Sequence, residues 1–412
     1  MAYRGYVEPA FEPVARLFAK LISAPDRGGG SFVVRYGDRT VVDIWGGVAD
    51  PRTGRPWQRD TLGLSFSTSK GVAATIIHRL ADRGLLDYDE PVAAYWREFA
   101  AGGKGRITVR QLLSHQAGLD ALTPVAPDAA ALLDHIAAEE RLAARTPEYR
   151  PGAPAYHSIT YGWLLAGLAR AITGEGMEAL VRTEINEPLG IDGLHYGLPA
   201  NVEQARVSAS VGSLGALVGL GRHALTWLRR PAPGRRLLHS IFVPDMAVIF
   251  SGYEPPALET VMPAANGMFS AESLATMYAA LGNGGIAGGR RLLSRETARA
   301  LSRVQTRAPD RNLVVPMVWR LGYHQAFVPR TWLPRAFGHF GYAGSGGWCD
   351  PSTGLAMAFV SNRIYPVSSP FGDLALMKLG RAALTAARAA DAPLQRERDA
   401  GGEHEHTAAD AA

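Results

Sequence analysis

Ser67-Thr68-Ser69-Lys70 decides the fold, because it places a hydroxyl and an amine three residues apart where a loop runs into an expected helix. Side chains at this spacing share one face of a helix, so Ser67 and Lys70 should lie side by side. A serine hydroxyl becomes a strong nucleophile only when a base takes its proton. Lysine can be that base only if burial or positive potential lowers its pKa from about 10.4. The helix N-terminus would also offer free N–H groups to an oxyanion.

Lysine is rare in this chain, which draws attention to Lys70. Lysine and arginine together number 43, but only four of them are lysines, namely Lys20, Lys70, Lys104 and Lys378. Arginine keeps its proton in proteins, so arginine could not replace Lys70 as a base. The other three lysines have no evident role in the sequence, so the scarcity of lysine supports the motif only mildly.

The composition is that of a globular protein of one two-lobed domain or two domains. The chain has 412 residues, of which 47% are hydrophobic and 20% charged. The net charge of +5 is spread along the chain without interleaved aromatic residues, so no nucleic-acid partner is expected. The single Cys349 excludes an internal disulfide and disfavours a thiolate zinc site, and we expect no metal or cofactor.

The chain also lacks the marks of a membrane or exported protein. No uncharged apolar run reaches about 18 residues, so no integral membrane segment is expected. The N-terminus has no apolar signal core before a cleavage site. A cytoplasmic protein is therefore expected, and the sequence does not indicate its oligomeric state.

Hydrophobic periodicity and turn signals predict an α+β protein. The expected helices span Phe11–Ile22, Ser67–Asp82, Ala271–Leu281 and Phe371–Ala390, and the expected strands span Ser31–Tyr36, Arg39–Trp45, Leu313–Gly322, Gly338–Cys349 and Leu355–Asn362. This order predicts one antiparallel sheet, flanked by helices and built from both chain ends (residues 1–84 and 265–390). We expect a helical lobe inserted between them (residues 85–264) and a disordered tail over residues 391–412.

Two further clusters carry chemistry. Tyr156-His157-Ser158 follows a proline-rich turn and precedes an apolar helix, where a tyrosine could relay protons if the charge of a lysine lowers its pKa. Alternating glycines over residues 338–347 would let a ligand approach the backbone and receive an N–H. Each cluster alone has a purely structural alternative, a packed tyrosine or a bulged hairpin. The chain contains no G-x-S-x-G motif, which argues against an α/β-hydrolase.

Together the three motifs, in this order, resemble the serine β-lactamase and penicillin-binding-protein superfamily on its class C-like, carboxylesterase side. The family pattern is S-x-x-K on a helix, then Y-x-N or Y-x-S, then K-T-G or H-x-G on a strand. In this chain the pattern occupies residues 67–70, 156–158 and 339–341. Secondary signatures of the family occur at Ile107–Leu119, Pro188–Gly190 and Asn266–Ala271. The resemblance extends over about residues 10–390.

The resemblance implies a serine hydrolase with Ser67 as the acylated nucleophile. Lys70 and Tyr156 would share the general-base and general-acid roles, and which of them deprotonates Ser67 is left open. The backbone N–H groups of Ser67 and Tyr342 would form the oxyanion hole. The remaining positions that the resemblance assigns to substrate binding are Ser158, His339 and Gly341.

Three departures from the family pattern favour a neutral ester as the small-molecule substrate. His339 replaces a permanent cation, and its ordinary pKa of about 6.5 leaves it mostly neutral at pH 7. Phe340 replaces a hydroxyl residue, and Ser158 replaces the asparagine that binds the amide side chain of lactams. Alternative hypotheses are a D-amino-acid peptidase or DD-peptidase, a weak β-lactamase, and a catalytically silent binding protein of the same fold.

The stretch from Val207 to Tyr253 is a candidate acyl pocket. It is rich in glycine, aliphatic and aromatic residues, including Trp227, Phe242, Met246 and Phe250. These residues could line a site for medium-chain acyl groups. The more conservative interpretation is that they form the core of the helical lobe.

Overall fold

The protein is described by a computed structural model that covers residues 3–23, 28–198, 202–212, 235–364 and 374–390. The strands of its main sheet are β1 (Arg4–Val7), β2 (Gly29–Tyr36), β3 (Arg39–Asp50), β4 (Arg55–Pro56), β11 (His324–Gln325), β12 (Phe337–Phe340), β13 (Gly346–Asp350) and β14 (Leu355–Ser361). Their order is β1-β3-β2-β14-β13-β12-β11, with β4 paired to β3, and every pairing is antiparallel. The central pairing joins β2 to β14, so both ends of the chain build one sheet, as predicted for this α+β fold.

The remaining strands are short. They are β5 (Gly63–Leu64), β6 (Leu194–Tyr196), β7 (Val211–Gly212), β8 (Gly267–Phe269), β9 (Ile286–Ala287), β10 (Arg290–Arg291) and β15 (Arg363–Ile364). Strand β8 pairs with both β5 and β6, which joins the segment before the Ser67 motif to the segment around residue 267. This small sheet attaches the segment that leads into Ser67 to the rest of the chain.

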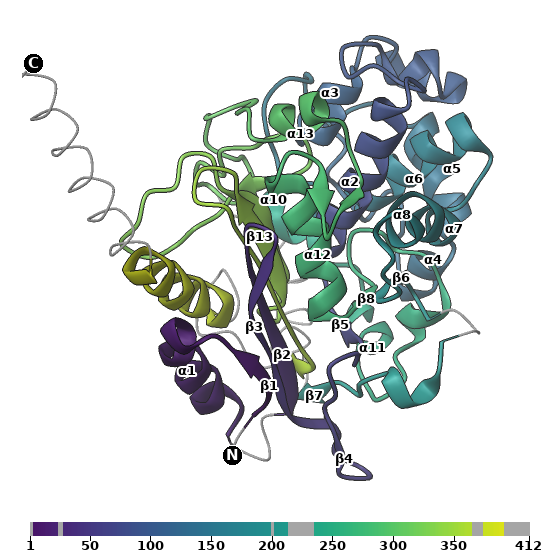
Figure 1. The fold of residues 1–412 in the computed structure, drawn as a ribbon. Coiled ribbons are helices and arrows are strands. Elements are labelled where there is room, and N and C mark those ends of the chain that lie inside the picture. Colours follow the sequence, from purple (N-terminus) through teal and green to yellow (C-terminus); the bar gives the residue numbers. More distant parts are fainter. Residues whose placement is uncertain (1–2, 24–27, 199–201, 213–234, 365–373, 391–412) are drawn as a thin grey trace, which may run out of the picture.

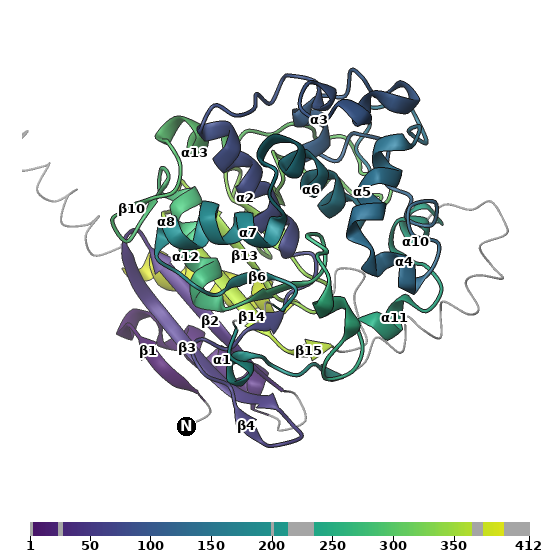
Figure 2. The same cartoon turned by 90° about the vertical axis from the view of Figure 1, so that its right-hand side faces the viewer.

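Helices cover both faces of the main sheet. They are α1 (Glu12–Ile22), α2 (Ser69–Asp82), α3 (Val109–Leu113), α4 (Ala129–Leu133), α5 (His135–Ala144), α6 (Thr160–Thr173), α7 (Met177–Val181), α8 (Glu187–Leu189), α10 (Arg235–Ile241), α11 (Met246–Ile249), α12 (Ala271–Gly282), α13 (Arg295–Leu301) and a helix over residues 375–390. Helix α1 and the helix over residues 375–390 share one face, and α12 packs on the other (Figure 1). Figure 2 looks onto the helical segments between residues 109 and 189 from the side opposite α1.

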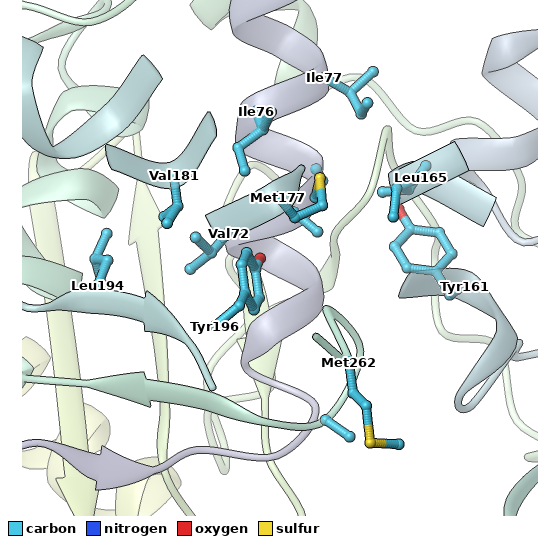
Figure 3. Close-up of a cluster of buried hydrophobic side chains, with 14 of the residues drawn as sticks. Val72, Ile76, Ile77, Tyr161, Leu165, Met177, Val181, Leu194, Tyr196 and Met262 are labelled. Carbon is cyan, nitrogen blue, oxygen red and sulfur yellow. The ribbon is translucent and has the colours of Figure 1, made fainter. Parts of the chain in front are cut away.

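Helix α2 is the buried axis of the molecule. Every residue from Ser69 to Leu80 except Arg79 is buried. The helix ends at Asp82, and two residues later Gly84 adopts φ +72°, so that the N–H of Leu85 returns to the carbonyl of Leu80. Side chains from α2, α6, α7 and β6 meet around it in one apolar cluster (Figure 3), which includes Val72, Ile76, Leu165, Val181 and Leu194. This packing fixes the position of the N-terminus of α2.

Two predicted strands were placed wrongly. Leu313–Gly322 is an irregular loop with one isolated bridge at Trp319, and the strand on that side is β11. The Asp310 carboxylate accepts the N–H groups of Asn312 and Leu313, so local side-chain bonds satisfy donors that a strand would use in a sheet. Gly338–Cys349 is not one strand but the hairpin of β12 and β13, with a turn over residues 341–345.

Smaller boundary differences concern the helices. Helix α2 begins at Ser69 rather than Ser67, because Ser67 lies in the turn that leads into it. The hairpin predicted over residues 31–45 is confirmed as β2 and β3, with longer strands on both sides of its turn. The start predicted for the last helix and the tail over residues 391–412 lie outside the described residues.

Gly347 gives a test of the packing between the sheet and α12. A Cβ atom at Gly347 would lie 2.5 Å from Cδ2 and 2.6 Å from Cε2 of the Tyr278 ring, which is buried on α12. We predict that Gly347→Ala lowers the free energy of unfolding by about 1–3 kcal/mol, because a rigid ring must shift. Thermal unfolding followed by circular dichroism measures this.

Gly105→Ala is the matched control, since the nearest atom to its Cβ is 4.0 Å away. Equal melting temperatures for the two variants would contradict the packing described.

Candidate active site

Ser67 lies in a strained turn immediately before α2. The preceding residue, Phe66, has φ +45°, a left-handed conformation that is costly for a residue with a Cβ. The turn is closed by hydrogen bonds from the N–H of Thr68 to Ser65 and from the N–H of Ser69 to Phe66. The neighbouring hydroxyl of Ser69 accepts the N–H of Gly267 at 2.9 Å, which ties the turn to β8. These contacts hold Ser67 at the end of α2, where it lines a pocket.

Lys70 lies beside Ser67, as the sequence predicted. Its Nζ is 3.0 Å from Ser67 Oγ and 2.8 Å from the carbonyl oxygen of Ala264. The side chain is fully buried, and burial lowers its pKa well below the ordinary value of a lysine. No described carboxylate offsets this effect, because no ion pair to Lys70 is present among the described residues.

The carbonyl of Ala264 is positioned by Asn266. The Asn266 side-chain amide donates to the carbonyls of Ala257 and Thr260 at 2.8 and 2.7 Å. Its oxygen accepts the N–H of Met262 at 3.0 Å. The buried amide thus closes the loop that presents Ala264 to Lys70, which gives a structural role to one secondary signature of the sequence.

The ring centroid of Tyr156 lies 5.0 Å from Lys70 Nζ, and Ser67 is close enough to its hydroxyl to influence the pKa of the tyrosine. The sequence argument made a proton relay by this tyrosine conditional on a lysine that lowers its pKa. In the structure, burial raises the pKa of Tyr156 above its ordinary value. The tyrosine is therefore a neutral hydroxyl donor in the resting site.

Aromatic neighbours fix the ring of Tyr156. It stacks on Trp319, with centroids 5.7 Å apart and an interplanar angle of 12°. His115 packs edge-on against it at 5.2 Å. The Nδ1 atom of His115 accepts the N–H of His157, so His115 also orders the loop that carries the tyrosine.

Sequence reasoning missed the loop that holds the backbone of Tyr156. The carboxylate of Asp310 accepts the N–H of Tyr156 at 3.1 Å and the indole N–H of Trp319 at 3.0 Å. The amide of Asn312 donates to the carbonyl of Tyr156 at 2.9 Å and to Asp120 at 2.8 Å. The available signal was the Asp310-Arg311-Asn312 triplet, which is typical of a side-chain-stabilised turn, whereas the apolar run after it indicated a strand.

The turn between β12 and β13 approaches Ser67 closely. Thr68 Oγ1 donates to the carbonyl of Ser345 at 2.9 Å. A Cβ atom at Gly341 would lie 2.2 Å from the carbonyl oxygen of Ser65, so only glycine allows this approach. Among the described residues, the N–H groups of Ser67 and Tyr342 donate no hydrogen bond, which leaves both for a ligand oxygen.

The other predicted binding residues surround the same pocket. His339 on β12 is buried, and burial together with His324 and Lys70 lowers its pKa well below the ordinary value, so its ring is neutral. Ser158 is also buried, and its hydroxyl lies 2.8 Å from the hydroxyl of Ser240 on α10. Ser67, Tyr156, Ser158, His339, Gly341 and Tyr342 all line this pocket, and Lys70 lies beneath Ser67.

The pocket has a volume of about 580 Å³ and a mostly apolar wall. Its described lining includes Leu237, Ile241, Phe242, Met246 and Phe250 from the stretch proposed as an acyl pocket. None of its described lining residues is Asp, Glu, Lys or Arg. Trp227, named in the same hypothesis, lies outside the described residues.

Neither a metal site nor a membrane helix accompanies the pocket in the part of the chain that the structure describes. There, no group of three or more His, Cys, Asp and Glu side chains is arranged to bind a metal ion. None of the described helices combines the length and apolar character that crossing a bilayer requires.

Comparisons with known proteins agree on one family. The model of the family described as Beta-lactamase matches residues 14–382. Esterase/beta-lactamase LipL of Mycobacterium tuberculosis (strain ATCC 25618 / H37Rv) is 44% identical over 363 residues, which cover 87% of this chain and 83% of LipL. Esterase EstB of Burkholderia gladioli is 30% identical over 163 residues, 35% of this chain and 41% of EstB.

Solved structures agree with this family. A family VIII carboxylesterase superposes with a TM-score of 0.81 at 33% identity, over 94% of this chain and 100% of that one. A penicillin-binding protein homologue from Caulobacter crescentus superposes with a TM-score of 0.79 at 32% identity, over the same shares of the two chains.

Asp310 provides a test of the site geometry. We predict that Asp310→Ala slows labelling of Ser67 by a fluorophosphonate probe by about tenfold to a hundredfold, because the backbone of Tyr156 is no longer held. Asp310→Asn should restore much of the rate, since its amide oxygen can still accept the backbone N–H groups.

Asp87→Ala is the matched control, because Asp87 makes the same kind of turn with the N–H of Asp89 at an exposed position. Labelling of a folded Asp310→Ala protein at the wild-type rate would refute a positioning role for Asp310.

Proposed function

The chain belongs to the beta-lactamase family, and from this premise we propose that it is a serine hydrolase that cleaves carboxylic esters through an acyl-enzyme on Ser67. The observation that carries the proposal is the pair formed by Ser67 and Lys70. The lysine is buried, has no described carboxylate partner and lies 3.0 Å from the serine hydroxyl. Burial lowers the pKa of this lysine well below its ordinary value, which favours the neutral amine that can accept the serine proton.

The hydrogen bonds of the resting site have one consistent direction under this proposal. Lys70 Nζ and Ser67 Oγ lie 3.0 Å apart, and in the neutral state of Lys70 the serine donates to the lone pair of Nζ while an N–H of Lys70 donates to the carbonyl of Ala264. This assigns Lys70, and not Tyr156, as the base that deprotonates Ser67. The opposite assignment would require a phenolate, which the raised pKa of Tyr156 disfavours.

Acylation then follows with every proton accounted for. Ser67 Oγ attacks the ester carbonyl carbon while its proton moves to Lys70 Nζ, and the carbonyl oxygen becomes an oxyanion held by the N–H groups of Ser67 and Tyr342. When the tetrahedral intermediate collapses, the carbon–oxygen bond to the alcohol breaks. The leaving alkoxide takes the proton of Tyr156, and the phenolate recovers a proton from Lys70.

Deacylation uses the same groups with water in the place of the alcohol. The water oxygen attacks the acyl carbon while one proton of the water passes to Tyr156 and the tyrosine passes its own proton to Lys70. The second intermediate collapses with release of Ser67 Oγ, which takes that proton back. The products are a carboxylic acid and the regenerated site.

The pocket favours neutral, apolar esters. A substrate carboxylate would lose its hydration against this wall without gaining an ion pair, since His339 is neutral and none of the described lining residues is arginine or lysine. Apolar groups instead gain from burial against the side chains of α10 and α11. The described lining residues between Leu237 and Phe250 are therefore proposed to form the wall for the acyl or alcohol group.

A second candidate activity is slow β-lactam hydrolysis. The relative from Mycobacterium tuberculosis is named for both esterase and beta-lactamase activity, which keeps this reaction under consideration. The common β-lactams carry a carboxylate, so the missing cation should make them poorer substrates than neutral esters.

We predict that the wild-type protein hydrolyses p-nitrophenyl esters of two to eight acyl carbons faster than nitrocefin. Ser67→Ala should lower the ester kcat/KM by at least about a thousandfold, because the nucleophile is lost. Steady-state kinetics with both substrates measure this.

Ser302→Ala serves as the control, because it removes a hydroxyl at an exposed position on the end of α13. Ester turnover that survives in Ser67→Ala, or nitrocefin turnover that exceeds ester turnover, would overturn the proposal.

A further inference from the structure

Two buried serines form a hydrogen-bonded pair at the wall of the pocket. Ser158 lines the pocket with 4% of its surface exposed, and Ser240 lies behind it on α10 with none. Their Oγ atoms are 2.8 Å apart. Ser240 Oγ also donates to the carbonyl of Leu237 at 2.8 Å. The pair is a fixed part of the pocket wall, because both hydroxyls are buried away from water.

The number of available protons determines which of the two hydroxyls donates to the other. Ser240 has one hydroxyl proton, and the carbonyl of Leu237 can only accept, so that proton is committed to Leu237. Ser158 must then be the donor in the contact between the two hydroxyls. The reverse arrangement would lose the bond from Ser240 to Leu237 and so make only one of the two bonds. Ser158 therefore offers lone pairs, and not a proton, to a bound substrate.

Two histidines also present hydrogen-bond acceptors to the pocket. His324 and His339 both line it, and their Nδ1 atoms lie 2.8 and 3.2 Å from the carbonyls of Gln325 and Phe340. A carbonyl only accepts, so each Nδ1 carries the proton and each Nε2 carries a lone pair. Nε2 of His339 is buried and has no hydrogen-bond partner among the described residues. Three polar side chains that line the same pocket as Ser67 thus present acceptors.

We propose that the preferred substrate is an ester that carries a hydrogen-bond donor, a hydroxyl or an N–H, close to its scissile carbonyl, and that Ser158, oriented by Ser240, binds this donor. Hydroxyacyl esters and partial esters of polyols have this chemistry, on the acyl and the alcohol side respectively. The inference rests on the proposed esterase function and adds the class of substrate to it. Ser240 acts as a positioning residue, since it touches Ser158 and not the substrate.

The test uses two sets of matched esters, with turnover followed by acid release in a pH-stat. The acyl set contains the ethyl esters of butanoate, 3-hydroxybutanoate and 3-methoxybutanoate. The alcohol set contains the propyl, 2-hydroxyethyl and 2-methoxyethyl esters of butanoate. The methoxy esters keep the added oxygen but lack its proton, so the ratio of kcat/KM for hydroxy over methoxy ester measures donor recognition and not size alone.

We expect this ratio to be roughly threefold to tenfold in one of the two sets for the wild type, the size of one hydrogen bond. Ser158→Ala should bring the ratio to about one whatever its absolute rate, because the acceptor is gone. Ser240→Ala frees the proton of Ser158, so the methoxy ester should gain and the ratio should fall. Ser302→Ala should keep the wild-type ratio, and thermal melts establish that each variant is folded.

The outcomes separate this inference from the proposed function. Ser67-dependent turnover with a ratio near one in both sets overturns donor recognition and leaves the esterase proposal intact. A wild-type preference that persists in folded Ser158→Ala overturns the role of Ser158. No Ser67-dependent turnover of any of the esters overturns both.

Discussion

The proposed mechanism depends on one constraint, which is that the amine of Lys70 must be kept out of water, next to Ser67 and without a counter-charge. A carboxylate beside Lys70 would stabilise its ammonium form, and the lysine could then no longer act as a base. Burial without a counter-charge lowers the pKa of the amine instead. The structure achieves this burial by enclosing α2 almost completely. The carbonyl of Ala264 orients the amine without supplying a full charge. Lys104 shows the contrast, since its buried amine bonds three carbonyls and has no nucleophile beside it.

The fold meets this constraint by bringing four distant segments to the N-terminus of α2. The turn after β12 approaches Ser65 so closely that Gly341 cannot carry a side chain. The loop around residues 264–267 supplies the partner of Lys70 and closes on Ser69. The loop that begins at Asp310 holds the backbone of Tyr156. Helix α10 supplies Ser240 behind Ser158. Because both chain ends share one sheet, these segments meet although they lie up to about 280 residues apart, as Thr68 and Ser345 show.

The sequence predicted the parts of this account that depend on local spacing. The contact of Ser67 with Lys70 follows from helix geometry, and the β2–β3 hairpin follows from its turn. The lowered pKa of Lys70 and the raised pKa of Tyr156 depend on burial by distant segments, which no local sequence pattern reveals. The roles of Asp310 and Ser240 were missed for the same reason, because each acts on a residue more than eighty positions away. The strand predicted at Leu313–Gly322 failed where side-chain bonds of Asp310 replaced a sheet ladder.

The most direct test of the central claim is the titration of Lys70 itself. With only four lysines in the chain, selective ¹⁵N-lysine labelling gives a simple NMR spectrum, and Lys70→Arg identifies its signal. This assignment matters because burial also lowers the pKa of Lys104, to about 8. The account predicts that the signal lost in Lys70→Arg belongs to an amine with a pKa well below the ordinary 10.5. A Lys70 signal that stays protonated at pH 7 and titrates near the ordinary 10.5 would contradict it.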